Sequence, residues 1–179
     1  QHKKAAELFD EVSLFRQLAN GQDVLSGKHA NTTIPKFIGA LKRYTVFTQS
    51  PTYYEMLTTQ EKQDLPMYRL AAENFFQIVV DHHTYATGAN SQSEHFHGPD
   101  TLHYDATQRG ESTGNPQTAE TCNEYNMLKL SRELFKITQD VKYANYYENT
   151  FINTIVSSQN PDTGMTMYFQ PMAPGYFKV

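Results

Sequence analysis

Apolar residues recur every three or four positions through most of the chain, which is the spacing of an amphipathic helix. The pattern predicts five helices: residues 5–19, about 33–47, about 53–82, 121 to about 137, and 141 to about 157. Pro66 is expected to interrupt the third of them. Because strands and helices do not alternate, the sequence predicts an all-α fold of helical hairpins, of the solenoid or toroid kind.

Two segments lack this period. Residues 84–117 are rich in Gly, Asn, Ser, His and Asp, and long loops of this kind inside a compact domain are usually functional. After a turn at 160–164, the tail 165–179 carries bulky residues around two prolines, which indicates an extended excursion. We expect the loops to form the active face at one end of the helices.

Composition excludes several classes of protein. The net charge of -4 and scattered basic residues argue against a nucleic-acid partner. No apolar run is long enough to span a membrane. The single cysteine, Cys122, excludes an intramolecular disulfide. The first residue is not Met, so we expect a piece of a longer protein, which leaves the cellular compartment open.

Chemistry concentrates at Glu120-Thr121-Cys122. Thr121 and Glu124 have the spacing of a capping box, which would place Thr121 at the N-cap and Cys122 at the first helical position. Across a helix start, the Glu120 carboxylate and the Cys122 sulfur could converge on one cation. The helix N-terminus would also lower the thiol pKa below its free value of about 8.5. The alternative is that Cys122 only packs and Glu120 is a solvated acid.

A second candidate lies in the polar loop. Glu94 follows Asn90 and Ser91 in a glycine-containing segment and could act as a general acid, or could simply be a solvated loop residue. The neighbouring histidines could be assembled into a metal site, but their spacing favours hydrogen-bonding or sugar-contacting roles. These histidines are His82, His83, His95, His97 and His103. Asp100 and Asp105 are read as solvated acids of the same loop.

Four motifs together resemble glycoside hydrolase family 127 and its relative, family 146. They are Gly27-Lys28-His29-Ala30-Asn31-Thr32-Thr33-Ile34-Pro35-Lys36, Gly88-x-Asn90-Ser91-x-x-Glu94-x-Phe96, Glu120-Thr121-Cys122-Asn123-x-Tyr125-Asn126-Met127-Leu128, and Tyr168-Phe169-Gln170-Pro171-Met172 followed by Gly175-Tyr176-Phe177-Lys178. Each motif alone is weak, but their order and separations match, and the resemblance covers nearly the whole chain.

The resemblance implies an (α/α)6 toroid of helical hairpins and the release of β-linked L-arabinofuranose with retention of configuration. It implies that Cys122 is a zinc-bound thiolate nucleophile, that Glu120 is a zinc ligand and that Glu94 is the acid/base. It also implies that His29, Tyr168 and Asn90 contact the sugar of a glycan substrate.

One departure from the family pattern concerns the metal. The resemblance implies two further, adjacent cysteine ligands downstream of Tyr176-Phe177-Lys178, and the chain has only Cys122. We therefore expect residues 1–179 to be one partial catalytic domain that binds zinc weakly and is inactive by itself. A toroid-type sugar epimerase or lyase and a non-catalytic carbohydrate-binding segment remain as alternatives. Homo-oligomerisation stays open.

Overall fold

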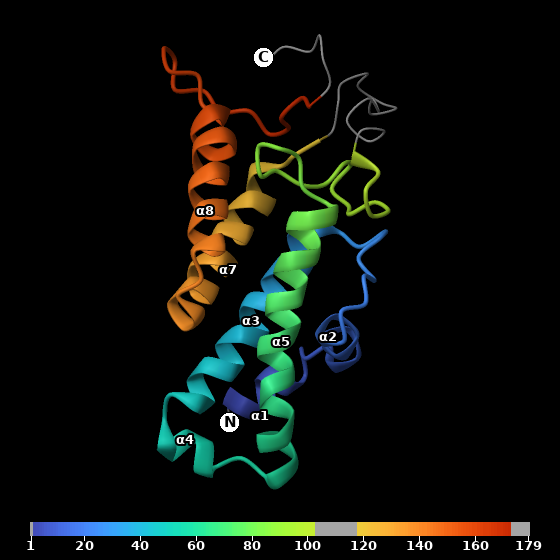
Figure 1. Ribbon diagram of the computed structural model, residues 1–179. Coiled ribbons are helices and arrows are strands. Elements are labelled where there is room, and N and C mark those ends of the chain that lie inside the picture. The colour runs from blue at the N-terminus through green and yellow to red at the C-terminus, as the bar shows by residue number, and fades with distance from the viewer. Residues whose placement is uncertain (1, 103–117, 173–179) are drawn as a thin grey trace.

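The computed structural model describes residues 2–102 and 118–172, which form an all-α arrangement (Figure 1). Its helices are α1 (His2–Glu7), α2 (Val12–Ala19), α3 (Ala30–Thr48), α4 (Pro51–Glu55), α5 (Thr59–His82), α7 (Thr121–Thr138) and α8 (Val141–Thr150). α8 continues through a π-helical turn, Phe151–Ile155, and a 3-10 turn, Val156–Ser158. Within the described ranges β pairing is confined to isolated bridges. The predicted all-α class is confirmed, whereas closure into a toroid stays a prediction.

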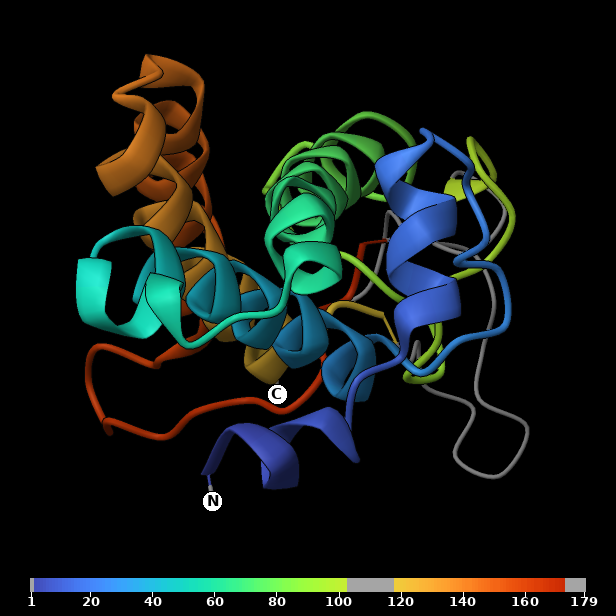
Figure 2. The same cartoon turned by 90° about the horizontal axis from the view of Figure 1, so that it is seen from below.

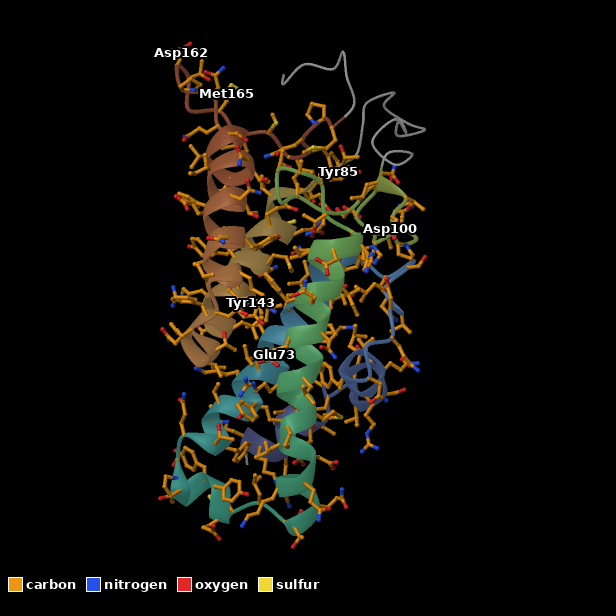
Figure 3. The ribbon with its side chains drawn as sticks, viewed as in Figure 1. Glu73, Tyr85, Asp100, Tyr143, Asp162 and Met165 are labelled. Carbon is orange, nitrogen blue, oxygen red and sulfur yellow. The ribbon has the colours of Figure 1, made fainter. Side chains whose placement is uncertain are left out.

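The directions of the long helices place the loops at one end of the molecule. α5 packs on α2 and α3, while α7 packs on α3 and α8. α3 and α7 start at the end of the molecule where α5 and α8 finish (Figure 1), and Figure 2 shows the helices from below. Tyr85, Asp100, Asp162 and Met165 all lie at the loop end, whereas Glu73 and Tyr143 lie midway along the helices (Figure 3). The expectation of one loop-bearing face is therefore met.

An aromatic cluster joins the helices to the loop that carries Glu94. The rings of Phe37 and Phe75 stack with their centroids 3.9 Å apart. Phe15 meets Phe37 edge-on, and Phe96 from the loop meets Phe75 in the same way at 6.3 Å. Because all four rings are almost completely buried, the loop residue Phe96 is part of the core. The backbone near Glu94 is thereby fixed to the helices.

The first predicted helix is two helices instead of one. Leu8 and Phe9, which were expected to continue an apolar stripe, are each 84% exposed. The N–H groups of Leu8 and Phe9 bond three residues back, which tightens and ends α1. Asp10 is then held by Arg43 of α3 at 2.9 Å, so the chain turns before α2 begins.

Pro66 does not break the third predicted helix. The break comes earlier, after α4, where Thr58 caps α5 in a reciprocal capping box with Glu61. Pro66 lies inside α5 and removes one backbone donor, while Leu65 and Tyr68 beside it are buried and hold the helix in place. Leu70 of the same helix is 47% exposed, although the apolar spacing of residues 67–82 predicts it on the buried face. Likewise, α3 starts at Ala30 and not near Thr33.

Among the described residues, none of the helices combines the length and the apolar character needed to cross a bilayer.

Candidate active site

The first turn of α7 differs from its prediction by one residue. Glu120, and not Thr121, is the N-cap, and no side chain caps the helix. Cys122 is therefore the second helical residue. The predicted capping box is wrong because Glu124 has a stronger competing partner: its Oε1 atom accepts the backbone N–H of Asn90 at 2.8 Å. The Glu124 carboxyl group consequently turns into the protein and away from the N-cap.

Glu120 and Cys122 nevertheless lie side by side at the helix start. The Cys122 Sγ atom is 3.9 Å from Glu120 Oε1, while Glu120 itself is buried. Burial, followed by the charges of Glu120 and Glu124, raises the pKa of Cys122 to about 11. The expected lowering by the helix N-terminus is therefore outweighed in the protein without a cation. A thiolate at this position needs a compensating positive charge.

The C-terminal segment of the described residues places Tyr168 beside Glu120 and Cys122. Phe169 forms an antiparallel bridge with Glu120, and the Gln170 N–H bonds to the Thr118 carbonyl at 2.9 Å. The Tyr168 ring is 59% exposed. Its hydroxyl interacts with the Glu120 carboxylate, and this hydrogen bond is the main reason why the pKa of Tyr168 is raised. Burial and the charges of Glu120, Cys122 and Glu94 raise that pKa further.

Glu94 lies on a strained loop beside the start of α3. Ser91, Ser93 and Glu94 all have left-handed backbones, with φ of 74°, 49° and 66°. Each such residue costs about 1–3 kcal/mol, so the surroundings must hold the loop in place. The Ala30 N–H bonds to the Glu94 carbonyl at 2.8 Å, and His29 Nε2 is 3.6 Å from Glu94 Oε2. His29 and Glu94 therefore share one half-exposed corner of the molecule.

Asn90 is placed differently from the other predicted sugar contacts. Its side chain is fully buried, and its amide atoms contact no hydrogen-bonding group of the described residues. Glu124 is also fully buried, and burial raises its pKa well above the usual range. The structure thus brings Glu94, Glu120, Cys122, His29 and Tyr168 to one end of the molecule, while Asn90 lies beneath them.

The loop histidines contact carboxylates and backbone carbonyls of the protein. His82 Nδ1 is 3.1 Å from Asp100 Oδ1, and His83 Nε2 is 2.9 Å from Asp23 Oδ2. His95 and His97 contact backbone carbonyls of the same loop. Across residues 2–102 and 118–172, no three His, Cys, Asp or Glu side chains cluster closely enough to hold a metal. His103 and Asp105 lie outside the described residues.

A known protein family matches this chain over its full length. The family of β-L-arabinofuranosidase, GH127 catalytic domains matches residues 1–179. The chain belongs to the GH127 catalytic-domain family. This confirms the resemblance that the four motifs predicted, and it supports a glycoside hydrolase acting on a glycan. Comparison with curated proteins gave no significant match.

The GH127 family implies zinc, and two residues of this chain fit that ion. Glu120 Oε2 is buried without a hydrogen-bond partner among the described residues, and the Cys122 sulfur is close to the same carboxylate. A carboxylate oxygen and a cysteine sulfur are both usual zinc ligands. The fit is partial, because a zinc site takes four ligands and a catalytic one commonly three from protein.

Sequence reasoning missed Asn123 and Glu124 as parts of the site. Asn123 Nδ2 donates to Ser91 Oγ at 2.7 Å, and both side chains are buried. The spacing of Thr121 and Glu124 predicted a capping box at the start of the helix. No pattern of neighbouring residues shows that the Glu124 carboxyl group instead accepts a hydrogen bond from a loop that is distant in sequence. The sequence offers one weak signal, the place of Asn123 in the motif that begins at Glu120, because burial is seen only in the folded protein.

Proposed function

We propose that this chain supplies part of the active site of a retaining β-L-arabinofuranosidase. Glu94 would be the acid/base, Glu120 and Cys122 would bind zinc, and Cys122 is the thiol that this chain offers as nucleophile. The observation that carries the proposal is that three separate segments of the sequence meet at this site. The Gln92–Thr118 and Glu120–Phe169 bridges join the Glu94 loop, the start of α7 and the tail that carries Tyr168. The Cys122 sulfur lies 3.9 Å from Glu120 Oε1 in this place.

In the proposed mechanism the reaction takes place as two successive displacements at the anomeric carbon. The Cys122 thiolate attacks the anomeric carbon, the bond to the leaving oxygen breaks, and Glu94 donates its proton to that oxygen. Glu94, now a carboxylate, then takes a proton from water. The water oxygen attacks the anomeric carbon, the carbon–sulfur bond breaks and the thiolate is released. Two inversions retain the configuration.

Electrostatics explain why a cation belongs in this mechanism. Zinc, when bound, would keep the Cys122 sulfur ionised between two carboxyl groups that otherwise favour the thiol. Tyr168 interacts with the Glu120 carboxylate and would help to orient that ligand. His29 stands beside Glu94 and is placed to contact the sugar or to orient the acid.

The decisive experiment separates the acid/base from the metal ligands in the intact enzyme. On a β-L-arabinofuranosyl disaccharide, Glu94→Gln, Glu120→Gln and Cys122→Ser should each lower kcat/KM at least about 100-fold. Glu120→Gln and Cys122→Ser should also lose zinc, measured by metal analysis, whereas Glu94→Gln should keep it. The matched control is Asp100→Asn, an exposed acid at the same end that contacts His82 and should leave turnover unchanged.

Mass spectrometry of a trapped glycosyl-enzyme tests the nucleophile directly. A mechanism-based inhibitor should add one glycosyl group to the peptide containing Cys122. An adduct on another residue, with zinc lost in Cys122→Ser, would restrict Cys122 to metal binding. Full activity in Cys122→Ser would overturn the proposed site altogether.

A further inference from the structure

One helical turn holds the two proposed metal ligands and also two anchors for the loop that carries Glu94. Glu120 and Cys122 stand at the start of α7, and the next two residues, Asn123 and Glu124, are completely buried. The ligands and the anchors therefore cannot move independently of each other.

Both anchors contact the loop just before Glu94. Glu124 Oε1 accepts the Asn90 N–H at 2.8 Å, and Asn123 Nδ2 donates to Ser91 Oγ at 2.7 Å. The Ser91 carbonyl also accepts the Ala119 N–H at 3.1 Å. These three bonds hold Ser91, whose backbone is left-handed, directly against the start of α7.

The loop is held at its other points by different helices. The Tyr146 hydroxyl of α8 donates to the Gly88 carbonyl at 2.9 Å, and the Ala30 N–H of α3 donates to the Glu94 carbonyl at 2.8 Å. The bonds from α7 are thus the middle support, and they connect the Glu94 loop to the turn that carries Glu120 and Cys122.

We propose that Glu124 and Asn123 are positioning residues that set the distance between the Glu94 acid and the Glu120–Cys122 pair. This inference rests on the proposed function of Glu94. Glu124 fixes this distance by accepting a hydrogen bond from the Asn90 N–H. The amide oxygen of a glutamine at position 124 can accept the same bond. A misplacement of about 1 Å at a reacting group can cost about 100-fold in rate.

The test uses the dependence of the reaction on the leaving group. A general acid matters for a sugar leaving group and much less for 4-nitrophenolate, which departs without a proton. Glu124→Met removes the acceptor, and Ser91→Ala removes the partner of Asn123 with little change in volume. Each should lower kcat/KM for a β-L-arabinofuranosyl disaccharide about 10- to 100-fold, and for 4-nitrophenyl β-L-arabinofuranoside by less than about threefold. Glu124→Gln should stay within about threefold of wild type on both substrates.

Ser131→Ala is the matched control, because Ser131 is a buried serine of the same helix whose hydroxyl donates to the Tyr143 carbonyl at 2.7 Å, away from the loop. It should lower stability without changing the ratio of the two kcat/KM values. A parallel fall on both substrates, or no fall, in the folded Ser91→Ala and Glu124→Met enzymes would overturn the positioning role. Glu94→Gln reports on the proposed function separately: if it lacks the leaving-group dependence, Glu94 is not the acid, whatever the other variants show.

Discussion

Gly88 should be the most sensitive glycine at the loop end of the molecule. It has φ of +89°, and a Cβ atom built on it would lie 1.9 Å from Thr150 Oγ1 and 3.0 Å from the Thr150 Cα atom. The left-handed backbone alone costs an L-residue about 1–2 kcal/mol. The clash adds about 1–3 kcal/mol, because the backbone of α8 cannot give way as a flexible side chain could. We expect Gly88→Ala to lose about 2–5 kcal/mol of unfolding free energy.

Gly21→Ala is the control that isolates the clash. Gly21 has a similar φ of +73°, but nothing lies within 4 Å of its built Cβ. Urea unfolding of the two variants at equal m values should therefore show Gly88→Ala less stable than Gly21→Ala by about 1–3 kcal/mol. Equal losses in the two variants would refute the steric argument. In a double-mutant cycle, Thr150→Ala should recover part of the loss, since it removes the nearest atom.

The remaining predictions concern the core and acid stability. Phe37→Ala should lower the unfolding free energy by about 3–5 kcal/mol, because it removes the buried ring that stacks on Phe75. As a control, Phe9→Ala removes an exposed ring and should change the unfolding free energy by less than about 0.5 kcal/mol. Chemical denaturation measures both values. Hydrogen bonds from Lys3 and from the start of α5 lower the pKa of Glu61 to about 2. The ionised Glu61 carboxylate therefore adds fully to the unfolding free energy above about pH 4.5, and this stabilisation is lost as the pH falls towards 2. Solvent screening limits it to about 1 kcal/mol, and Glu61→Gln should flatten the stability profile over that window; an unchanged slope would contradict this assignment.

The first turn of α7 shows how far local reasoning reaches. The spacing of apolar residues located the helix, and the capping-box spacing placed its start within one residue of the observed N-cap, Glu120, because both patterns depend only on neighbouring residues. The same reasoning assigned Glu124 to a cap. In the folded protein the backbone N–H of Asn90 competes for that carboxyl group and wins, and no local pattern contains that contact.

What the sequence by itself determined is the all-α class, most of the helices and the family with its candidate residues. Helix periodicity and short motifs are properties of neighbouring residues, and they survive in any tertiary setting. Tertiary structure alone decided which candidates meet. It brought Tyr168 onto Glu120 and buried Asn90, and it raised the pKa of Cys122 where the helix start by itself would have lowered it. Burial and charge depend on segments that are distant in sequence, so they exist only after the chain has folded.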